Sequence, residues 1–305
     1  MDGYFAGAAT HSIFGHREAE MNEKSRSSED PGTPTATRSF EYVAFGSLGR
    51  EVFRLGLSAT YRPGRATVHR ALDAGVSVYF CYGFDGQMTG ALRELPSSRR
   101  QQLVYVTGAY NLLWGHPNLR RSLEKRLGQL RTDYIDCFLF LGVMGREKYL
   151  DRVLEELQQF RQEGKVRATG VSIHTRKLAG SLVARGAIQA LMMRYNAAHR
   201  GAEEDIFPHL AAHNPAVISY TATRWTALLR RPRGWPQQGR IPTAALCYRF
   251  VLSNPHVHVC LTAPRSAREF DENLAALRAG PLPEDDLQFM RDFGDAVHAQ
   301  RKWFM

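Results

Sequence analysis

The chain has 305 residues, of which 44% are hydrophobic, and its 40 basic and 30 acidic side chains give a formal net charge of +10 at pH 7. This size suits one large α/β barrel or two smaller domains, and we expect one domain. No apolar run reaches about 18 residues and the first residues do not resemble a secretory signal, so we expect neither a membrane span nor secretion.

The positive charge is spread over arginine-rich patches and is not gathered in a basic helix or an aromatic-basic binding motif. Solvated helix faces explain such patches, so we expect no specific binding of nucleic acid. The four cysteines are far apart, and three of them lie in apolar segments where a buried free thiol is typical. These features favour a reducing, cytoplasmic location.

One clear change of composition occurs near residue 39. The segment from Glu18 to Arg38 is dense in Glu, Ser, Thr, Lys and Pro and poor in large apolar residues. Such a segment cannot bury enough surface to offset the entropy of ordering its chain. We therefore expect a disordered tail over residues 1–39 and a folded domain over residues 40–305.

From Phe40 onward, strands and amphipathic helices alternate. Segments 41–45 and 51–55 flank a glycine-containing turn and predict a β-hairpin. Apolar strands are then predicted over 55–59, 76–80, 103–107, 134–141, 168–172, 188–193, 216–220 and 258–261. Helices are predicted between them, including 118–130, 149–163, 176–185, 203–213, 243–253 and 267–278, with an extra helix over 285–303.

Eight strand-helix units favour a closed (β/α)8 TIM barrel with an N-terminal β-hairpin. The alternative, an open doubly wound sheet, lacks the expected Gly-x-Gly-x-x-Gly turn after the first strand. In a barrel, catalytic groups lie just beyond the carboxyl ends of the strands.

Two other signals are weaker: His209 and His213 have helical metal-ligand spacing without an evident third ligand, and the loop from Trp225 to Arg240 is long enough to serve as a lid.

Several segments resemble the aldo/keto reductase family, in the right order over about residues 40–280. The segment 71–77 is similar to the family's ALDAGVN run, and 131–136 to its entry into the fourth strand. The segment 164–172 is similar to the family's run that ends in Gly-Val-Ser, Tyr195-Asn196 matches its Tyr-Asn pair, and 265–274 its cofactor-binding end. The resemblance implies NADP(H) bound across the top of the barrel and reduction of a small carbonyl compound by hydride transfer.

The resemblance also implies a catalytic Asp, Tyr, Lys and His, from which this sequence departs. The Asp, Lys and His positions fall on Phe80, Gly108 and Leu141. If three residues are missing after the second strand, Tyr82 keeps the place of the proton-donating tyrosine. Without that gap Asp85 occupies it, and we prefer the first register because it keeps the Tyr-Gly pair and the following helix together.

A tyrosine with a pKa near about 10 is a poor acid without a neighbouring charge, so other groups are needed. Asp85 and His174 are the candidate substitutes, with Tyr110 and Asn111 as hydrogen-bonding groups. The alternative interpretation makes the tyrosines wall aromatics and His174 a polar residue at a helix N-terminus.

For the cofactor, the resemblance places Ser172 at the nicotinamide carboxamide and Tyr220 against the ring, with Met192 in place of the family's Gln. Arg265 and Ser266 open a helix whose N-terminus favours phosphate, and Arg265 pairing with a 2′-phosphate implies NADP over NAD. Glu269 and Asn273 are placed to reach the adenine. The alternative is an ordinary capped helix with an exposed arginine.

Three hypotheses follow. The first is an NADP-dependent oxidoreductase with Tyr82, Asp85 and His174 as a non-standard catalytic set. The second is a catalytically silent NADP(H)-binding barrel that acts as a sensor or interaction subunit. The third is an enzyme that keeps the barrel and performs non-redox chemistry.

Overall fold

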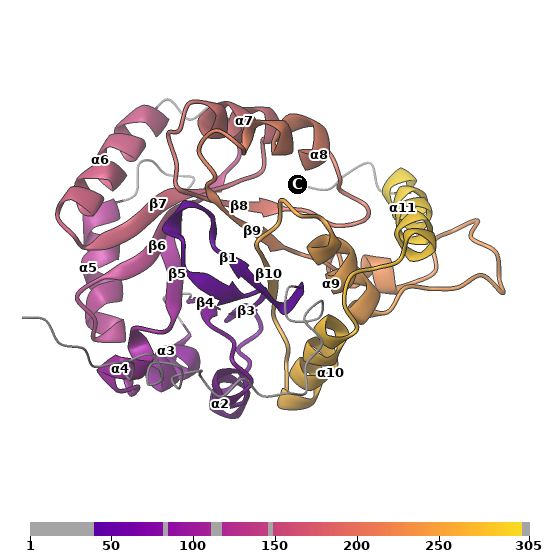
Figure 1. Ribbon diagram of the computed structural model, residues 1–305, viewed down its shortest axis with the longest axis horizontal. Coiled ribbons are helices and arrows are strands. Elements are labelled where there is room, and N and C mark those ends of the chain that lie inside the picture. The colour runs from indigo at the N-terminus through magenta and orange to yellow at the C-terminus, as the bar shows by residue number, and fades with distance from the viewer. Residues whose placement is uncertain (1–39, 82–84, 111–117, 146–148, 301–305) are drawn as a thin grey trace, which may run out of the picture. The chain divides into compact units, whose positions relative to one another are not determined.

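The computed structural model describes residues 40–81, 85–110, 118–145 and 149–300. Eight parallel strands close into a barrel in the order β10-β3-β4-β5-β6-β7-β8-β9, with helices outside the ring (Figure 1). The strands are β3 (Leu55–Ser58), β4 (Val78–Phe80), β5 (Val104–Tyr110), β6 (Ile135–Val143), β7 (Val166–Ile173), β8 (Ala190–Arg194), β9 (Ala216–Tyr220) and β10 (Val259–Thr262). The predicted (β/α)8 TIM barrel is confirmed.

The helices cover the outer face of the barrel because each carries an apolar stripe at helical spacing. In α6, for example, the buried residues are Leu150, Val153, Leu157 and Phe160. The helices are α2 (Arg65–Asp73), α3 (Gly86–Arg93), α4 (Ser97–Arg100), α5 (Leu119–Leu130), α6 (Leu150–Gln162), α7 (Arg176–Ala184), α8 (Ala202–Asp205), α9 (Ala244–Ser253), α10 (Ala267–Arg278) and α11 (Glu284–Ala299). Within the described ranges, no helix is long and apolar enough to cross a membrane.

The predicted helix over 203–213 is wrong. The chain instead forms the short α8 and a separate 3-10 turn, Phe207–His209. Pro208 explains the break, because its ring removes a backbone donor and clashes with the preceding helical turn. Among the described residues there is no group of three or more His, Cys, Asp or Glu that could hold a metal ion.

The N-terminal hairpin closes the amino end of the barrel. It pairs β1 (Tyr42–Ala44) with β2 (Glu51–Phe53) in antiparallel fashion. Its turn lies against the start of β9: the Ser47 amide donates to the Asn214 carbonyl at 2.6 Å, and a Cβ on Gly46 would lie 2.5 Å from the Ala216 nitrogen. The predicted hairpin is therefore present, whereas the predicted tail lies outside the described residues and stays a prediction.

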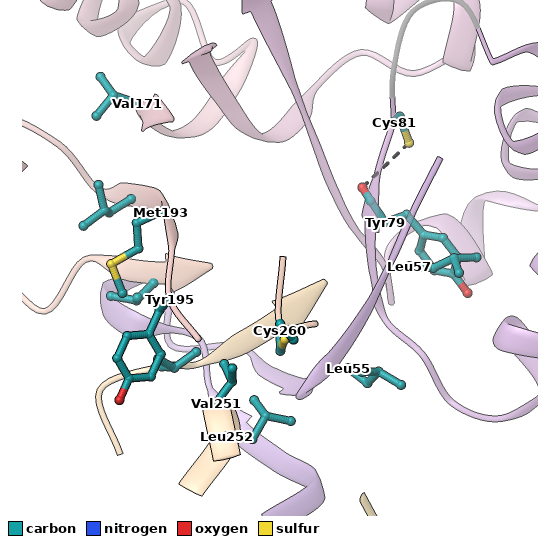
Figure 2. Close-up of a cluster of buried hydrophobic side chains, with 14 of the residues drawn as sticks. Leu55, Leu57, Tyr79, Cys81, Val171, Met193, Tyr195, Val251, Leu252 and Cys260 are labelled. Carbon is teal, nitrogen blue, oxygen red and sulfur yellow. Dashed lines mark hydrogen bonds between the residues drawn. The ribbon is translucent and has the colours of Figure 1, made fainter. Parts of the chain in front are cut away.

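Apolar side chains fill both faces of the barrel sheet. The outer cluster packs the strands against the helices, and Figure 2 shows part of it, including Leu55, Leu57 and Met193. The four cysteines are buried free thiols. The interior cluster consists of Phe45, Val52, Val78, Phe80, Val104, Val106, Cys137, Leu139, Leu141, Ala168, Ala190, Met192, Ala216, Ile218, Val259 and Leu261.

A buried carboxylate holds the amino ends of β5, β6 and β7 together. Asp136 is 1% exposed and pairs with Arg100 at 3.0 Å, Arg167 at 3.0 Å and Arg50 at 3.4 Å. It also accepts a hydrogen bond from the Tyr105 amide at 2.9 Å. Because this network lies at the amino ends of the strands, it serves stability and leaves the other end of the barrel for chemistry.

Candidate active site

In the sequence, Phe80, Gly108 and Leu141 fall at the positions expected for a catalytic Asp, Lys and His. In the structure, none of these three positions at the carboxyl end of the barrel carries a polar side chain. Phe80 and Leu141 are 2% and 3% exposed and belong to the interior cluster. At Gly108 a Cβ would lie 1.9 Å from the Leu139 carbonyl oxygen and 3.0 Å from Leu141 Cγ. The backbone therefore leaves no room for a side chain at position 108, and this half of the mouth carries no ion at these positions.

Polar residues gather at the ends of β7, β8 and β9. Ser172 pairs in register with Met192, and Arg194 pairs in register with Tyr220. Because Met192 is in the interior cluster and alternate residues of a strand share one face, Arg194 continues the inward row of β8. Ser172 is 8% exposed and Tyr220 is half-buried. The structure thus brings the two predicted nicotinamide-binding residues to the same side of the mouth.

His174 lies directly beyond β7 in this group. Its amide donates to the Val143 carbonyl at 2.9 Å, and its ring packs edge-on against Tyr220 with the ring centroids 6.4 Å apart. Its Nδ1 atom is buried and has no hydrogen-bond partner among the described residues. Burial, and next the charge of Arg194, lower the pKa of His174 below its ordinary value. The imidazole is therefore neutral at pH 7.

Arg194 and His199 were missed by the sequence reasoning. Both line a small cavity of about 10 Å³ together with His174, Arg176 and the apolar residues Ile173, Met193 and Ile206. Burial, and next Arg194 and Arg224, lower the pKa of His199 to about 3. The only available signal in the sequence was the position of Arg194 directly before the Tyr195-Asn196 pair.

A larger cavity, of about 190 Å³, lies at the opposite end of the barrel beside α3, α4 and the end of α5. It is lined by residues that precede β5 and β6, including Gln101 and Tyr134. The smaller cavity is the candidate active site, because catalytic groups of this fold come from the carboxyl ends of the strands.

The two remaining predicted catalytic residues follow β4. Tyr82 lies outside the described residues. Asp85 is 3% exposed and caps α3, because one carboxylate oxygen accepts a hydrogen bond from the Gln87 amide at 3.1 Å. Its other oxygen is buried without a hydrogen-bond partner among the described residues. The structure thus gives Asp85 a capping role, and its catalytic role stays a prediction.

Tyr110 and Asn111 were suggested as hydrogen-bonding groups after β5. Tyr110 ends β5 and is 41% exposed. Asn111 lies outside the described residues.

The Tyr195-Asn196 pair fixes the loop after β8. The Tyr195 hydroxyl donates to Glu203 at 2.5 Å and accepts from the Asn254 amide at 3.1 Å. Asn196 is fully buried and donates to the Thr221 carbonyl at 2.9 Å. These contacts hold the ends of β8 and β9 in position and so orient the residues of the mouth.

The loop after β9 is tightly wound and is held by α11. Four of its non-glycine residues have positive φ angles: Thr221 at 60°, Arg224 at 49°, Trp225 at 48° and Thr226 at 67°. Arg224 is 2% exposed and donates to the Val297 carbonyl at 2.9 Å. Such conformations are costly for β-branched residues and persist where the surrounding structure imposes them.

The long loop predicted as a lid continues from this segment. Its Trp235 packs against α11, with ring centroids 4.9 Å from Phe293 and 6.4 Å from Phe289. Part of the loop is therefore anchored on the barrel's last helix. Its closure over a cofactor stays a prediction.

The predicted phosphate end is formed by the start of α10. The Ser266 hydroxyl accepts from the Glu269 amide at 3.2 Å, and the Glu269 carboxylate accepts from the Arg265 amide at 2.9 Å. The exposed Arg265 guanidinium lies 5.2 Å from the centroid of the Tyr61 ring. Asn273 is 4% exposed and donates to Thr262 Oγ1 at 3.0 Å. The contacts of Glu269 and Asn273 with an adenine ring stay predictions.

Comparison with known proteins gives a consistent result. The profile of the Aldo/keto reductase family matches residues 64–240. Two curated proteins of Bacillus subtilis (strain 168) are similar to this chain: "Uncharacterized oxidoreductase YqkF" is 22% identical over 199 residues, and "Aldo-keto reductase YhdN" is 24% identical over 207 residues. These matches cover 57% and 59% of this chain and 64% and 61% of the relatives, so the chain spans less than two thirds of either.

Solved structures share the fold. The holo form of aldo-keto reductase AKR11C1 from Bacillus halodurans is 20% identical, with a TM-score of 0.69 over 84% of this chain and 97% of that chain. An aldo/keto reductase from Klebsiella pneumoniae, solved in complex with NADP and acetate, is 23% identical, with a TM-score of 0.67 over 84% of this chain and 95% of that chain.

Proposed function

Because the chain belongs to the aldo/keto reductase family, we propose that it binds NADP(H) at the carboxyl end of the barrel and reduces an aldehyde or ketone with a non-standard catalytic set. The observation that carries the proposal is that the carboxyl end of the barrel has two groups of residues suited to the cofactor, one to the nicotinamide and one to a phosphate. Ser172 lies one residue before the end of β7 and Tyr220 ends β9, while Arg265 directly precedes Ser266, the N-cap of α10 after β10. A further support is the Klebsiella pneumoniae neighbour, which was solved with NADP.

The donor set at α10 fits a phosphate group. The helix has 12 residues, and its N-terminus presents backbone amides together with the guanidinium groups of Arg265 and Arg268. Glu269 already accepts from the Arg265 amide, and Arg268 pairs with Glu272 at 3.1 Å. A phosphate at this end would take over contacts that carboxylates now make, and both carboxylates are on the exposed surface where they can move away.

The nicotinamide end is supported by fewer groups. Ser172 offers a hydroxyl to the carboxamide and Tyr220 an aromatic face to the ring, while Met192 beside Ser172 is apolar. When bound, NADPH supplies the hydride. The chain itself has to position the carbonyl compound and deliver one proton to its oxygen.

We assign proton delivery to Tyr82, with Asp85 and His174 as the polar groups that assist it. Phe80 and Leu141 are apolar members of the interior cluster, so neither supplies a charge that would lower the pKa of a tyrosine. His174, whose pKa burial lowers, is the polar group beside Tyr220 that can orient the bound substrate with its one N–H donor. This division of roles predicts slow proton transfer compared with a tyrosine beside a cation.

The test measures binding and turnover separately. Fluorescence titration with NADPH measures binding, and loss of nicotinamide absorbance over a panel of aldehydes and ketones measures turnover. We expect Tyr82→Phe to keep NADPH affinity and to lose at least about 100-fold in kcat, the smallest effect typical of removing a general acid. Tyr42→Phe, which removes a hydroxyl at the amino end of the barrel, should change neither quantity.

A second candidate function follows from Phe80, Gly108 and Leu141. A mouth without ions at these positions suits a catalytically silent barrel that binds NADP(H) as a sensor or interaction subunit. NADPH binding with no turnover in wild type and Tyr82→Phe alike would favour this function and exclude the reductase.

A further inference from the structure

The polar cluster at the ends of β7 and β8 has features that the reduction of a carbonyl does not by itself require. His174 and Arg194 stand one layer above Ser172 and Met192, because each lies two residues farther along its strand direction. Both line the cavity of about 10 Å³, together with Arg176 and His199. The cavity is thus lined by two arginines, two histidines and three apolar residues, with no acidic side chain.

The electrostatic environment of this cavity is positive. In the part of the chain that the structure describes, the charged groups that lower the pKa of His199 are Arg194, Arg224, His298 and Arg176. The Arg194 pKa is itself lowered, first by burial, while Tyr220 opposes and Arg176 adds to that shift. One carboxylate is near: Asp205 pairs with Arg176 at 2.8 Å. An anion near Arg194 would therefore be held in a region of partly desolvated positive charge.

The N-terminus of α7 adds to this field. The helix has nine residues, and its N-cap residue Thr175 makes no side-chain capping hydrogen bond. The Thr175 hydroxyl donates instead to the Met144 carbonyl. The amides of the first turn therefore present the positive end of the helix dipole beside Arg176.

Two features indicate that this cavity is suited to a ligand oxygen atom. Arg176 is held in place by Asp205 and by Gly201, where a Cβ would lie 2.4 Å from the guanidinium carbon. His174 Nδ1 is buried and lacks a hydrogen-bond partner among the described residues. A ligand oxygen at this atom would satisfy it.

The size of the cavity and the guanidinium groups that line it favour a carboxylate. A cavity of about 10 Å³ has room for one oxygen atom. A carboxylate can place one oxygen there and keep the other within reach of a guanidinium, whose planar fork matches it. A phosphate group brings more oxygens and a second charge into the same volume.

We propose that His174, Arg176, Arg194 and His199 bind the carboxylate group of an anionic substrate. With the proposed function, on which this assignment of the ligand rests, the substrate class becomes aldehydes or ketones that carry a carboxylate. The site is separate from the phosphate end at α10.

Binding of benzoate, compared with its neutral isostere benzamide, tests the proposal without turnover. Isothermal titration of the full chain, with and without saturating NADPH, should give a Kd for benzoate that rises at least about 10-fold in Arg194→Gln, the loss expected for one charge-assisted contact. Arg185→Gln removes the same charge from the exposed end of α7, where Arg185 pairs with Asp151, and should change the Kd less than twofold. Arg194→Lys keeps the charge but not the fork and should give an intermediate Kd. If Arg194→Gln does not fold, the lysine variant makes the comparison.

Three results would overturn the proposal. They are no binding of benzoate by the wild type under either condition, equal Kd values in Arg194→Gln and wild type, and competition in which NADPH displaces benzoate. The last result would assign the positive cluster to a phosphate of the cofactor. By contrast, a protein that binds benzoate through Arg194 but does not bind NADPH would support the carboxylate site while contradicting the proposed function.

Discussion

Replacement of Arg265 by glutamine tests the phosphate end of the proposed cofactor site. The guanidinium is exposed and stacks over Tyr61 at 5.2 Å, so it is pre-positioned at the start of α10. A charge-assisted hydrogen bond contributes about 1.5–3 kcal/mol, and solvent exposure places this one at the lower end. A loss of about 1.5 kcal/mol corresponds to about a tenfold rise in the Kd for NADPH. NADH lacks the 2′-phosphate, so its Kd should change less than twofold.

The assay is fluorescence titration of wild type and Arg265→Gln with both nucleotides at two salt concentrations, because an exposed charge contact weakens as salt rises. Arg278→Gln removes the same charge from the last turn of α10 and serves as the control. Tyr61→Leu should cause a smaller loss, since it removes only the stacking surface. Equal losses for NADPH and NADH, or no loss at all, would refute the assignment of Arg265 to the 2′-phosphate.

Three further predictions concern stability. Asp136→Asn should lower the free energy of unfolding in urea by about 3–5 kcal/mol, because it leaves a cluster of arginines without their buried carboxylate; a loss below about 1 kcal/mol would contradict this. Gly108→Ala should cost about 3 kcal/mol or more in the same assay, given a Cβ 1.9 Å from a carbonyl oxygen, and a neutral result would show that β5 and β6 can separate. Burial, and next Arg54, lower the pKa of His258 to about 4, whereas an unfolded histidine titrates near about 6.5. Below about pH 6.5 the unfolded chain therefore binds a proton at this histidine that the folded chain does not. The free energy of unfolding is thus highest above about pH 6.5 and falls by about 3 kcal/mol toward pH 4. In urea unfolding at a series of pH values, His258→Gln should make this decline smaller by about 3 kcal/mol, while the decline due to His199 remains; an unchanged pH profile would exclude His258 as a source.

The barrel was predictable because each strand and helix carries its own periodicity. The apolar spacing of α6 and the eight short apolar strands specify the alternation, and the hairpin turn is marked by its glycines. The helix expected over 203–213 failed at Pro208, where a helical pattern continued past a residue that cannot extend it. Helices and strands were thus predicted correctly where the apolar periodicity was not interrupted by a residue, such as proline, that the backbone of that element cannot accommodate.

The site was less predictable because its chemistry depends on burial and on neighbours from other strands. Ser172 and Tyr220 could be named from the family motifs, and the structure places both at the mouth. Arg194 looks like an ordinary surface arginine in the sequence. Only the register of β8 against β7 and β9 puts it in the inward row, where burial lowers its pKa. The capping contact of Asp85 is one that an Asp directly before a helix predicts, but from the sequence this residue was assigned to catalysis alone.

The distribution of charge at the mouth bears on how this barrel would stabilise a reaction. The apolar residues Phe80 and Leu141 lie near the ends of β4 and β6, while His174 and Arg194 lie at the ends of β7 and β8. Apolar surroundings strengthen the field of a nearby cation, because less water screens it. Under the proposed function, groups around the substrate serve hydride transfer best when they do not have to reorient as charge develops. Arg194 bound to a substrate carboxylate, beside the neutral His174, would therefore hold the carbonyl compound at one side of the mouth, with little tuning of the acidity of Tyr82.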